Sequence, residues 1–106
     1  MSPYPACGPM YKIVLTHQAE KDTKKIEQAG LKTKTVNFLR ILGQNPFQNP
    51  PLYEKLQGYN NVYSRRINIQ HRLVYQVLPN ENDEKDATGI LYQGIIKIIR
   101  MWTHYE

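Results

Sequence analysis

The chain has 106 residues and a formal net charge of +5 at pH 7, which suits one domain with a single modest core. Cys7 is its only cysteine, so an intrachain disulfide and a thiolate metal site are both excluded. The three histidines lie far apart and lack the spacing of a zinc site. Because no apolar stretch approaches the length of a membrane span and the start lacks a signal-peptide pattern, we expect a soluble cytoplasmic protein.

The positive charge is concentrated in the middle of the chain. No acidic residue lies between Lys55 and Asn80. Such an uncompensated field attracts nucleic acid or an acidic protein segment, and charge alone does not choose between those partners. Four of the nine carboxylates fall instead in one later loop, namely Glu81, Asp83, Glu84 and Asp86.

The first nine residues predict a leader rather than a packed element. They hold three prolines and a glycine and no charge. We therefore expect a flexible leader over 1–9 and a single domain over 10–106, with Met10 as an alternative start.

A strand and a polar helix are predicted next. Residues 11–15 form an apolar run that is typical of a buried strand. The hydroxyl of Thr16 can then accept a backbone N–H in the first turn of a helix. This helix is expected over 17–29, and Gly30 supplies the break that ends it.

A second helix and a stiff loop follow. The pattern predicts a helix over 32–42, with Val36 among its inward residues and Gly43 as its end. Together with the first helix it forms a helical hairpin packed on a sheet. The proline-containing loop over 44–51 then delivers Glu54.

Residues 63–75 predict a hairpin of two strands. They hold three arginines and one histidine and no carboxylate. If the apolar residues of both strands face the helices, alternation places Arg66 and Arg72 on the open face, while Arg65 lies nearer a strand end. Each guanidinium can donate two parallel hydrogen bonds to a phosphate without losing its charge.

The last third predicts an acidic loop over 79–89 and β-structure over 90–102 that is interrupted near Gly94. The fold class we expect is α+β, with two N-terminal helices packed on an antiparallel sheet.

The residue types match the cleavage of RNA without a metal or another cofactor. A base must take the proton of the 2′-hydroxyl, cations must stabilise the charge on the phosphate, and an acid must protonate the leaving 5′ oxygen. Glu54, Arg72 with Arg66, and His104 can fill these roles if the fold brings them together.

Each of these residues also has an ordinary explanation. Glu54 can be a surface carboxylate paired with Lys55, and His104 can be a solvent-exposed histidine. The arginines can belong to a solvated hairpin face. The sequence alone does not prove that the three groups lie side by side.

Three short motifs resemble a known family. The chain is similar to the Txe/YoeB family of toxins in the RelE/ParE superfamily at three places. These are Tyr63-Ser64-Arg65-Arg66-Ile67, His71-Arg72-Leu73-Val74-Tyr75 and the closing His104-Tyr105. The resemblance extends from about Met10 to Tyr105.

The resemblance implies a compact RelE-like (microbial RNase-like) fold and a toxin of a toxin–antitoxin system. Such toxins enter the A site of the 70S ribosome and cut the mRNA there, leaving a 2′,3′-cyclic phosphate. It also implies an acidic antitoxin partner and often a homodimer.

The same resemblance implies roles for individual residues. Glu54 matches the general base, Arg72 the arginine at the transition state and His104 the general acid, with Tyr105 as the adjacent aromatic residue. Arg66 matches a phosphate-binding arginine. Arg65 and Lys55 are expected to contact RNA or phosphate as well.

The sequence leaves two other functions open. A non-enzymatic ParE-like toxin would inhibit a protein target such as a topoisomerase, and a plain RNA-binding module would bind RNA in a salt-sensitive way without cutting it.

Overall fold

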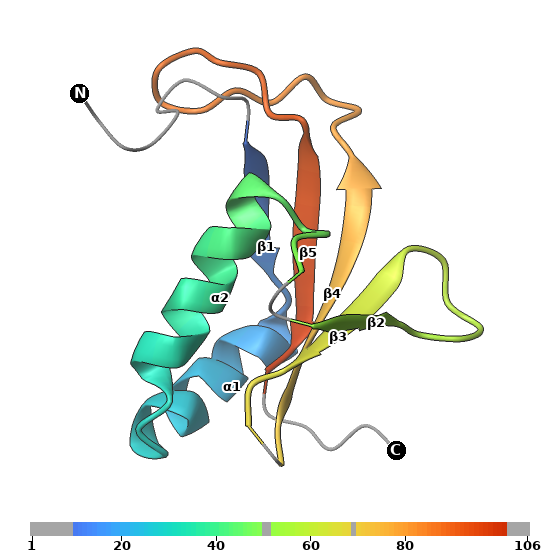
Figure 1. Ribbon diagram of the computed structural model, residues 1–106. Coiled ribbons are helices and arrows are strands. Elements are labelled where there is room, and N and C mark those ends of the chain that lie inside the picture. The colour runs from blue at the N-terminus through green and yellow to red at the C-terminus, as the bar shows by residue number, and fades with distance from the viewer. Residues whose placement is uncertain (1–9, 50–51, 69, 102–106) are drawn as a thin grey trace.

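The computed structural model describes residues 10–49, 52–68 and 70–101 (Figure 1). Five strands form one sheet in the order β1-β5-β4-β3-β2, and two helices pack against one of its faces. The elements are β1 (Tyr11–Leu15), α1 (His17–Gln28), α2 (Lys32–Gln44), β2 (Tyr53–Lys55), β3 (Val62–Arg66), β4 (Arg72–Pro79) and β5 (Gly94–Arg100). This arrangement confirms the α+β class with two N-terminal helices on a sheet.

The sheet is mixed rather than wholly antiparallel. β1 pairs with β5 in parallel, and the other three strand pairs are antiparallel. A parallel pair needs a long crossover connection, and here everything from α1 to β4 lies between the two strands. The first and last strands of the described residues are therefore neighbours.

Helix α1 begins and ends as the sequence predicts. The Thr16 hydroxyl accepts a hydrogen bond from the backbone N–H of Ala19 at 3.1 Å, which caps the first turn. Gly30 follows the helix with φ of +75°, a conformation that glycine adopts without strain.

Helix α2 runs two residues beyond its predicted end. Gly43 lies inside the helix, which continues to Gln44. Asn45 is extended, with φ −156° and ψ 103°. The helix ends there because the residue before a proline, here Pro46, is disfavoured in the helical region.

The core lies between the helices and the sheet. Val36, predicted to face inward, is 41% exposed, because the helix presents the positions of Phe38 and Leu42 to the sheet instead. The main buried side chains are Ala19, Ile26, Phe38, Leu42, Leu73, Tyr75, Ile96 and Ile98.

Gly94 begins a strand instead of interrupting one. Its backbone lies so close to its neighbours that an added Cβ would lie 2.8 Å from the carbonyl oxygen of Leu78 and 3.0 Å from the ring of Tyr11. The glycine thus permits a close approach between strands. Residues 90–93 form no strand, apart from a single bridge between Leu91 and Lys85.

No helix in the described part of the chain is long and apolar enough to span a bilayer.

Candidate active site

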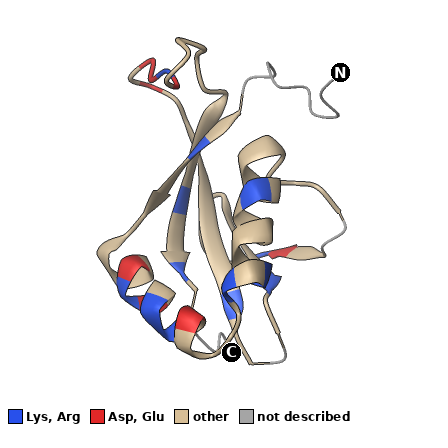
Figure 2. Ribbon diagram, turned by 90° about the vertical axis from the view of Figure 1, so that its left-hand side faces the viewer, with Lys and Arg blue, Asp and Glu red and all other residues tan. Residues whose placement is uncertain are grey.

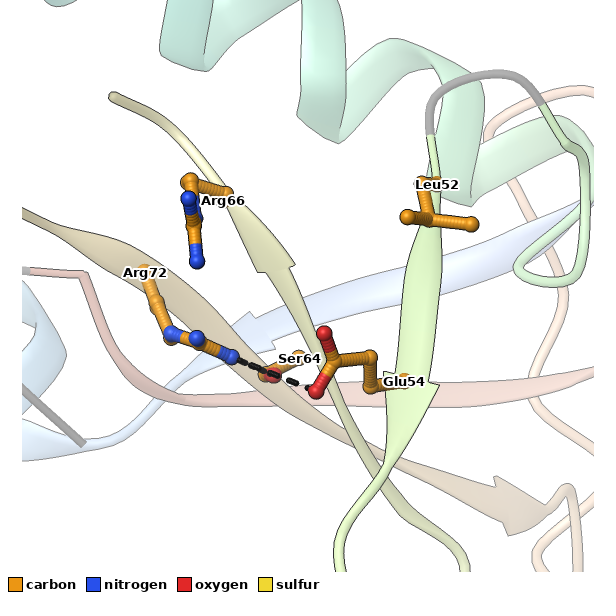
Figure 3. A pocket seen from close by; sticks show the side chains of 5 residues that line it. All are labelled: Leu52, Glu54, Ser64, Arg66 and Arg72. Atoms are coloured by element: carbon orange, nitrogen blue, oxygen red, sulfur yellow. Dashed lines mark hydrogen bonds and ion pairs between the residues drawn. The ribbon is translucent and has the colours of Figure 1, made fainter. Parts of the chain in front are cut away.

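A pocket of about 330 Å³ opens on the helix-free face of the sheet (Figure 3). Its lining residues are Leu52, Glu54, Ser64, Arg66 and Arg72. One carboxylate and two guanidinium groups thus point into the same space.

The sheet register places these side chains together. Glu54 lies opposite Ser64 across β2 and β3, and Arg66 lies opposite Arg72 across β3 and β4. Side chains two residues apart on a strand share a face, so Ser64 and Arg66 point the same way. The prediction that Arg66 and Arg72 share the open face is confirmed, and Glu54 comes from a strand rather than from a loop.

The Glu54 carboxylate is only loosely held. Its Oε2 lies 3.5 Å from Nη1 of Arg72, and the same Nη1 donates to the Ser64 hydroxyl at 3.4 Å. Both distances are long for hydrogen bonds. The Glu54 side chain is 59% exposed and that of Arg72 is 22% exposed, so the carboxylate remains accessible to a ligand.

Arg66 contributes a second cation to the pocket. It forms no hydrogen bond or ion pair with another described residue, and Figure 3 shows its guanidinium above that of Arg72. Like charges directly opposite each other on neighbouring strands are unfavourable. A bound anion such as a phosphate would relieve this repulsion.

Arg65 has a structural place in the core instead of the predicted contact with phosphate. It is 1% exposed, and its Nη2 donates to the carbonyl oxygen of Pro46 at 2.9 Å. Its guanidinium carbon lies 5.1 Å from the ring centre of Tyr53. Alternation turns this side chain away from the pocket, because its neighbours Ser64 and Arg66 point into it.

Lys55 lies outside the pocket. It is exposed and follows Glu54 on β2, so its side chain leaves the opposite side of the strand. It borders a separate hollow formed with residues 56–60.

His104 and Tyr105 lie outside the described residues. The structure does place the end of β5, because Arg100 pairs with Val74 on β4. Val74 is two residues from Arg72, a step of about 7 Å along a strand. The strand that leads to His104 therefore ends one strand away from Arg72.

Two pocket residues were not singled out from the sequence. Ser64 is 1% exposed and accepts from Arg72, and Leu52 is 69% exposed at the rim. Alternation from Arg66 would have placed Ser64 on the same face. Leu52 carries no such signal, because it precedes β2.

Within residues 10–49, 52–68 and 70–101, no three His, Cys, Asp or Glu side chains are grouped so that they could hold a metal ion.

The sequence matches no protein-family model and no curated protein, and its relatives are found among solved structures. A YoeB/ParE toxin from Agrobacterium tumefaciens is 25% identical, with a TM-score of 0.68 over 89% of this chain and 99% of the other. The YoeB dimer from Staphylococcus aureus is 28% identical, with a TM-score of 0.65 over 90% of this chain and 98% of the other. The YoeB–YefM complex from Staphylococcus aureus is 29% identical, with a TM-score of 0.64 over 90% and 98%.

These neighbours share the α+β architecture along nearly their whole length, and the first three are named as YoeB toxins or contain one. Two of the three motifs that resemble the Txe/YoeB family, residues 63–67 and 71–75, run along β3 and β4 and supply Ser64, Arg66 and Arg72 to the pocket. In fold and in these motifs the chain is similar to YoeB toxins, which supports a toxin of a toxin–antitoxin system.

Proposed function

We propose that the chain is an endoribonuclease that enters the A site of the ribosome in the cytoplasm and cuts the mRNA there. The observation that carries this proposal is the convergence of Glu54, Arg66 and Arg72 in one open pocket. A carboxylate beside two guanidinium groups provides a base and an anion-binding site that can act on the same phosphate group.

The proposed reaction uses these three groups together with His104. Glu54 takes the proton of the 2′-hydroxyl, and the 2′ oxygen forms a bond to phosphorus. The bond from phosphorus to the 5′ oxygen breaks, and His104 donates a proton to that oxygen. The products are a 2′,3′-cyclic phosphate and a 5′-hydroxyl. In the transition state Arg72 and Arg66 stabilise the negative charge that develops on the phosphate.

The long ion pair between Glu54 and Arg72 suits a substrate-dependent rearrangement. An incoming phosphate offers Arg72 two oxygens in a planar geometry, which is a better partner than a carboxylate oxygen at 3.5 Å. Once Arg72 turns to the phosphate, Glu54 is free to accept the proton. Arg66 has no competing partner in the described residues, and it binds the same phosphate from β3, the strand beside that of Arg72.

We assign the remaining expected residues to contacts with the RNA around the reacting atoms. Tyr105 follows the proposed acid and would contact the RNA beside it. Lys55 points away from the pocket, so we assign it to the RNA beyond the cut linkage, where a phosphate contact contributes affinity rather than chemistry.

The proposed partners are the mRNA, the ribosome, an acidic antitoxin and a second copy of the chain. The toxin in one Staphylococcus aureus structure is bound to YefM, and in another it is a dimer. For this chain, the basic stretch around the pocket supports an acidic partner.

The test is cleavage of mRNA by purified protein on stalled ribosomes with a defined A-site codon. Glu54→Gln and Arg72→Gln should each lower the cleavage rate about 10²- to 10⁴-fold, the scale for losing an acid–base group or a charge-stabilising group. Lys32→Gln, a change of the same kind on α2 and outside the pocket, is the control and should cleave normally.

Parental rates in both pocket variants would contradict the assignment. Intact mRNA together with damaged DNA would favour the ParE-like alternative, a toxin that inhibits a topoisomerase. RNA binding without any strand scission would favour the plain RNA-binding module.

A further inference from the structure

The geometry points to Asp22 on α1 as a positioning residue for the general acid, acting together with Thr16 through the end of β5. This inference rests on the proposed function, because it concerns how His104 is brought to the leaving oxygen. Asp22 itself has no place in the pocket, which is lined from β2, β3, β4 and Leu52.

Asp22 is a fully buried carboxylate that holds the end of β5. It is 0% exposed, and its Oδ2 accepts from Nε of Arg100 at 2.9 Å and from the backbone N–H of Met101 at 3.0 Å. Its Oδ1 accepts from the Gln18 amide at 3.1 Å. Both carboxylate oxygens are thus engaged, and two of these three donors belong to the place where β5 leaves the sheet.

Thr16 holds the same part of β5 from the start of α1. Its hydroxyl accepts from Ala19 and donates to the carbonyl oxygen of Ile99 at 2.9 Å. Ile99 is an extra residue in β5, because Tyr75 pairs with Ile98 while the adjacent residue of β4 pairs with Arg100. The end of the strand is therefore a β-bulge whose carbonyl is bound by the Thr16 side chain.

A bulge at the end of a strand changes the direction in which the chain leaves it. His104 lies three residues after Met101. We propose that the direction in which the chain leaves β5 at Met101 limits where the His104 ring can reach. The exit lies beside the pocket, since Arg100 is paired with a residue two positions from Arg72. A misplacement of a catalytic group by about 1 Å can cost about 100-fold in rate.

The buried charge itself supports a specific role. A carboxylate without solvent access is costly to desolvate, and a well-packed apolar pair often stabilises a fold as well or better. Asp22 gives what an apolar residue cannot, a fixed acceptor for one particular backbone N–H. The contact therefore determines a direction, in addition to holding α1 on the sheet.

The test separates loss of the acid from general damage by changing the leaving group. RNA with sulfur in place of the bridging 5′ oxygen releases a thiolate, which needs no proton from the enzyme. In the Asp22→Asn variant the side chain has one acceptor oxygen in place of two, so it cannot serve all three donors.

The Asp22→Asn change should slow cleavage of the ordinary linkage about 10- to 100-fold on ribosomes. Because the sulfur linkage bypasses the acid, its loss should stay within about threefold. Thr16→Ala should show the same selectivity in a weaker form, which keeps the inference testable if Asp22→Asn does not fold. Thr16→Ser, which keeps the hydroxyl, should restore both rates.

Two controls frame the result. Glu54→Gln removes the base and should slow both linkages alike. Ile26→Val alters the core of the same helix and should leave the ratio of the two rates unchanged. If Asp22→Asn and Thr16→Ala slow both linkages by the same factor, Asp22 has a structural role only and the inference fails.

The hydrogen bond between Asp22 and the Met101 backbone N–H can be tested without measuring cleavage. Asp22→Asn should speed hydrogen exchange at the Met101 amide, while exchange in β3 stays as in the parent protein. Unchanged exchange at Met101 would overturn the inference even if the proposed function holds. A parent protein that cleaves neither linkage would instead contradict the proposed function.

Discussion

At the scale of single residues, two neighbouring arginines have opposite surroundings. Arg66 is exposed in the pocket, whereas Arg65 is 1% exposed and donates to the Pro46 carbonyl. The same carbonyl accepts from the Tyr75 hydroxyl at 2.8 Å. The Pro46 carbonyl oxygen thus connects the loop after α2 to β3 and β4 through two hydrogen bonds. In the sequence this loop is followed by β2, which carries Glu54.

The paired arginines give a matched test of stability. Arg65→Lys keeps the charge but loses the planar donor and its stacking on Tyr53, so the free energy of unfolding should fall by about 1.5–3 kcal/mol, the scale of a hydrogen bond to a charged group. Arg66→Lys, at the surface, should stay within about 0.5 kcal/mol. Urea unfolding of both variants measures the difference, and equal values would contradict the structural role of Arg65.

Tyr75 predicts a loss of stability at alkaline pH. Burial raises the pKa of Tyr75 above its usual value, and the Arg65 charge opposes this only in part. In the unfolded chain the phenol ionises near pH 10, at a lower pH than in the folded protein. The stabilisation that the neutral Tyr75 gives the folded protein is therefore complete below about pH 10 and declines as the pH rises further. Tyr75→Phe removes it, and the variant's unfolding free energy should fall less steeply between about pH 9 and 11. Parallel curves for the two proteins would contradict the assignment.

The sequence predicts part of the site and misses the rest for a physical reason. Strand alternation was sufficient to place Arg66 and Arg72 together, because both lie in one hairpin. The burial of Arg65 depends on the Pro46 carbonyl, 19 residues away, and no local pattern encodes that contact. His104 and Tyr105 remain predictions from the family resemblance.

At the scale of elements, the helix limits were predictable where a local signal acts. Thr16 and Gly30 delimit α1 as expected, because a cap and a left-handed residue act within one turn. The short strand β2 was not predicted, since three residues after a proline-rich loop become a strand only by pairing with β3. Gly43 and Gly94 were both expected to break an element, and both lie within one.

These two glycines predict opposite effects of the same substitution. Gly94→Ala should lower the free energy of unfolding by about 1–3 kcal/mol, because its Cβ would meet the Leu78 carbonyl at 2.8 Å. Gly43→Ala should raise it by about 0.5–1 kcal/mol, because the nearest atom to its Cβ is 3.8 Å away and alanine favours the helix. Thermal unfolding measures both signs. Similar losses in both variants would mean that strand contact is not what requires glycine at 94.

At the scale of the whole molecule, acidic and basic regions lie at opposite ends of β4. Arg72 begins this strand and Pro79 ends it, a separation of about 23 Å for an extended chain. The acidic loop follows Pro79, and Figure 2 shows its red segments at one extremity of the ribbon, away from the helices. Its carboxylates therefore do little to weaken the attraction of the pocket for phosphate, since charges farther apart than about 10 Å are largely screened by salt.

The loop is ordered by contacts of its own. The Asn80 amide donates to the carbonyls of Glu84 and Tyr92 at 2.9 Å and 3.0 Å, and its oxygen accepts from the backbone N–H of Glu84 at 2.9 Å. Glu84 also forms an ion pair with Lys12 on β1.

Asn80→Ala should therefore loosen the loop and leave the pocket intact. Hydrogen exchange should become faster at the amides of Glu84 and Tyr92, while mRNA cleavage proceeds at the parental rate. Asp83→Asn, an exposed position in the same loop that does not contribute to the Asn80 hydrogen bonds, is the matched control for exchange. A cleavage defect as large as that of Glu54→Gln would mean that the two ends of the molecule are coupled.

The parallel pairing of β1 with β5 has a consequence for how the protein is made. β1 has β5 as its neighbour, and β5 is synthesised after every other element that the structure describes. β5 also completes the core through Ile96 and Ile98. A growing chain that has exposed Glu54, Arg66 and Arg72 still lacks that strand, so the pocket residues emerge before the sheet that holds them can close. We therefore expect a protein that we propose acts on ribosomes to remain unfolded, and inactive, on the ribosome that is making it until β5 has left the exit tunnel.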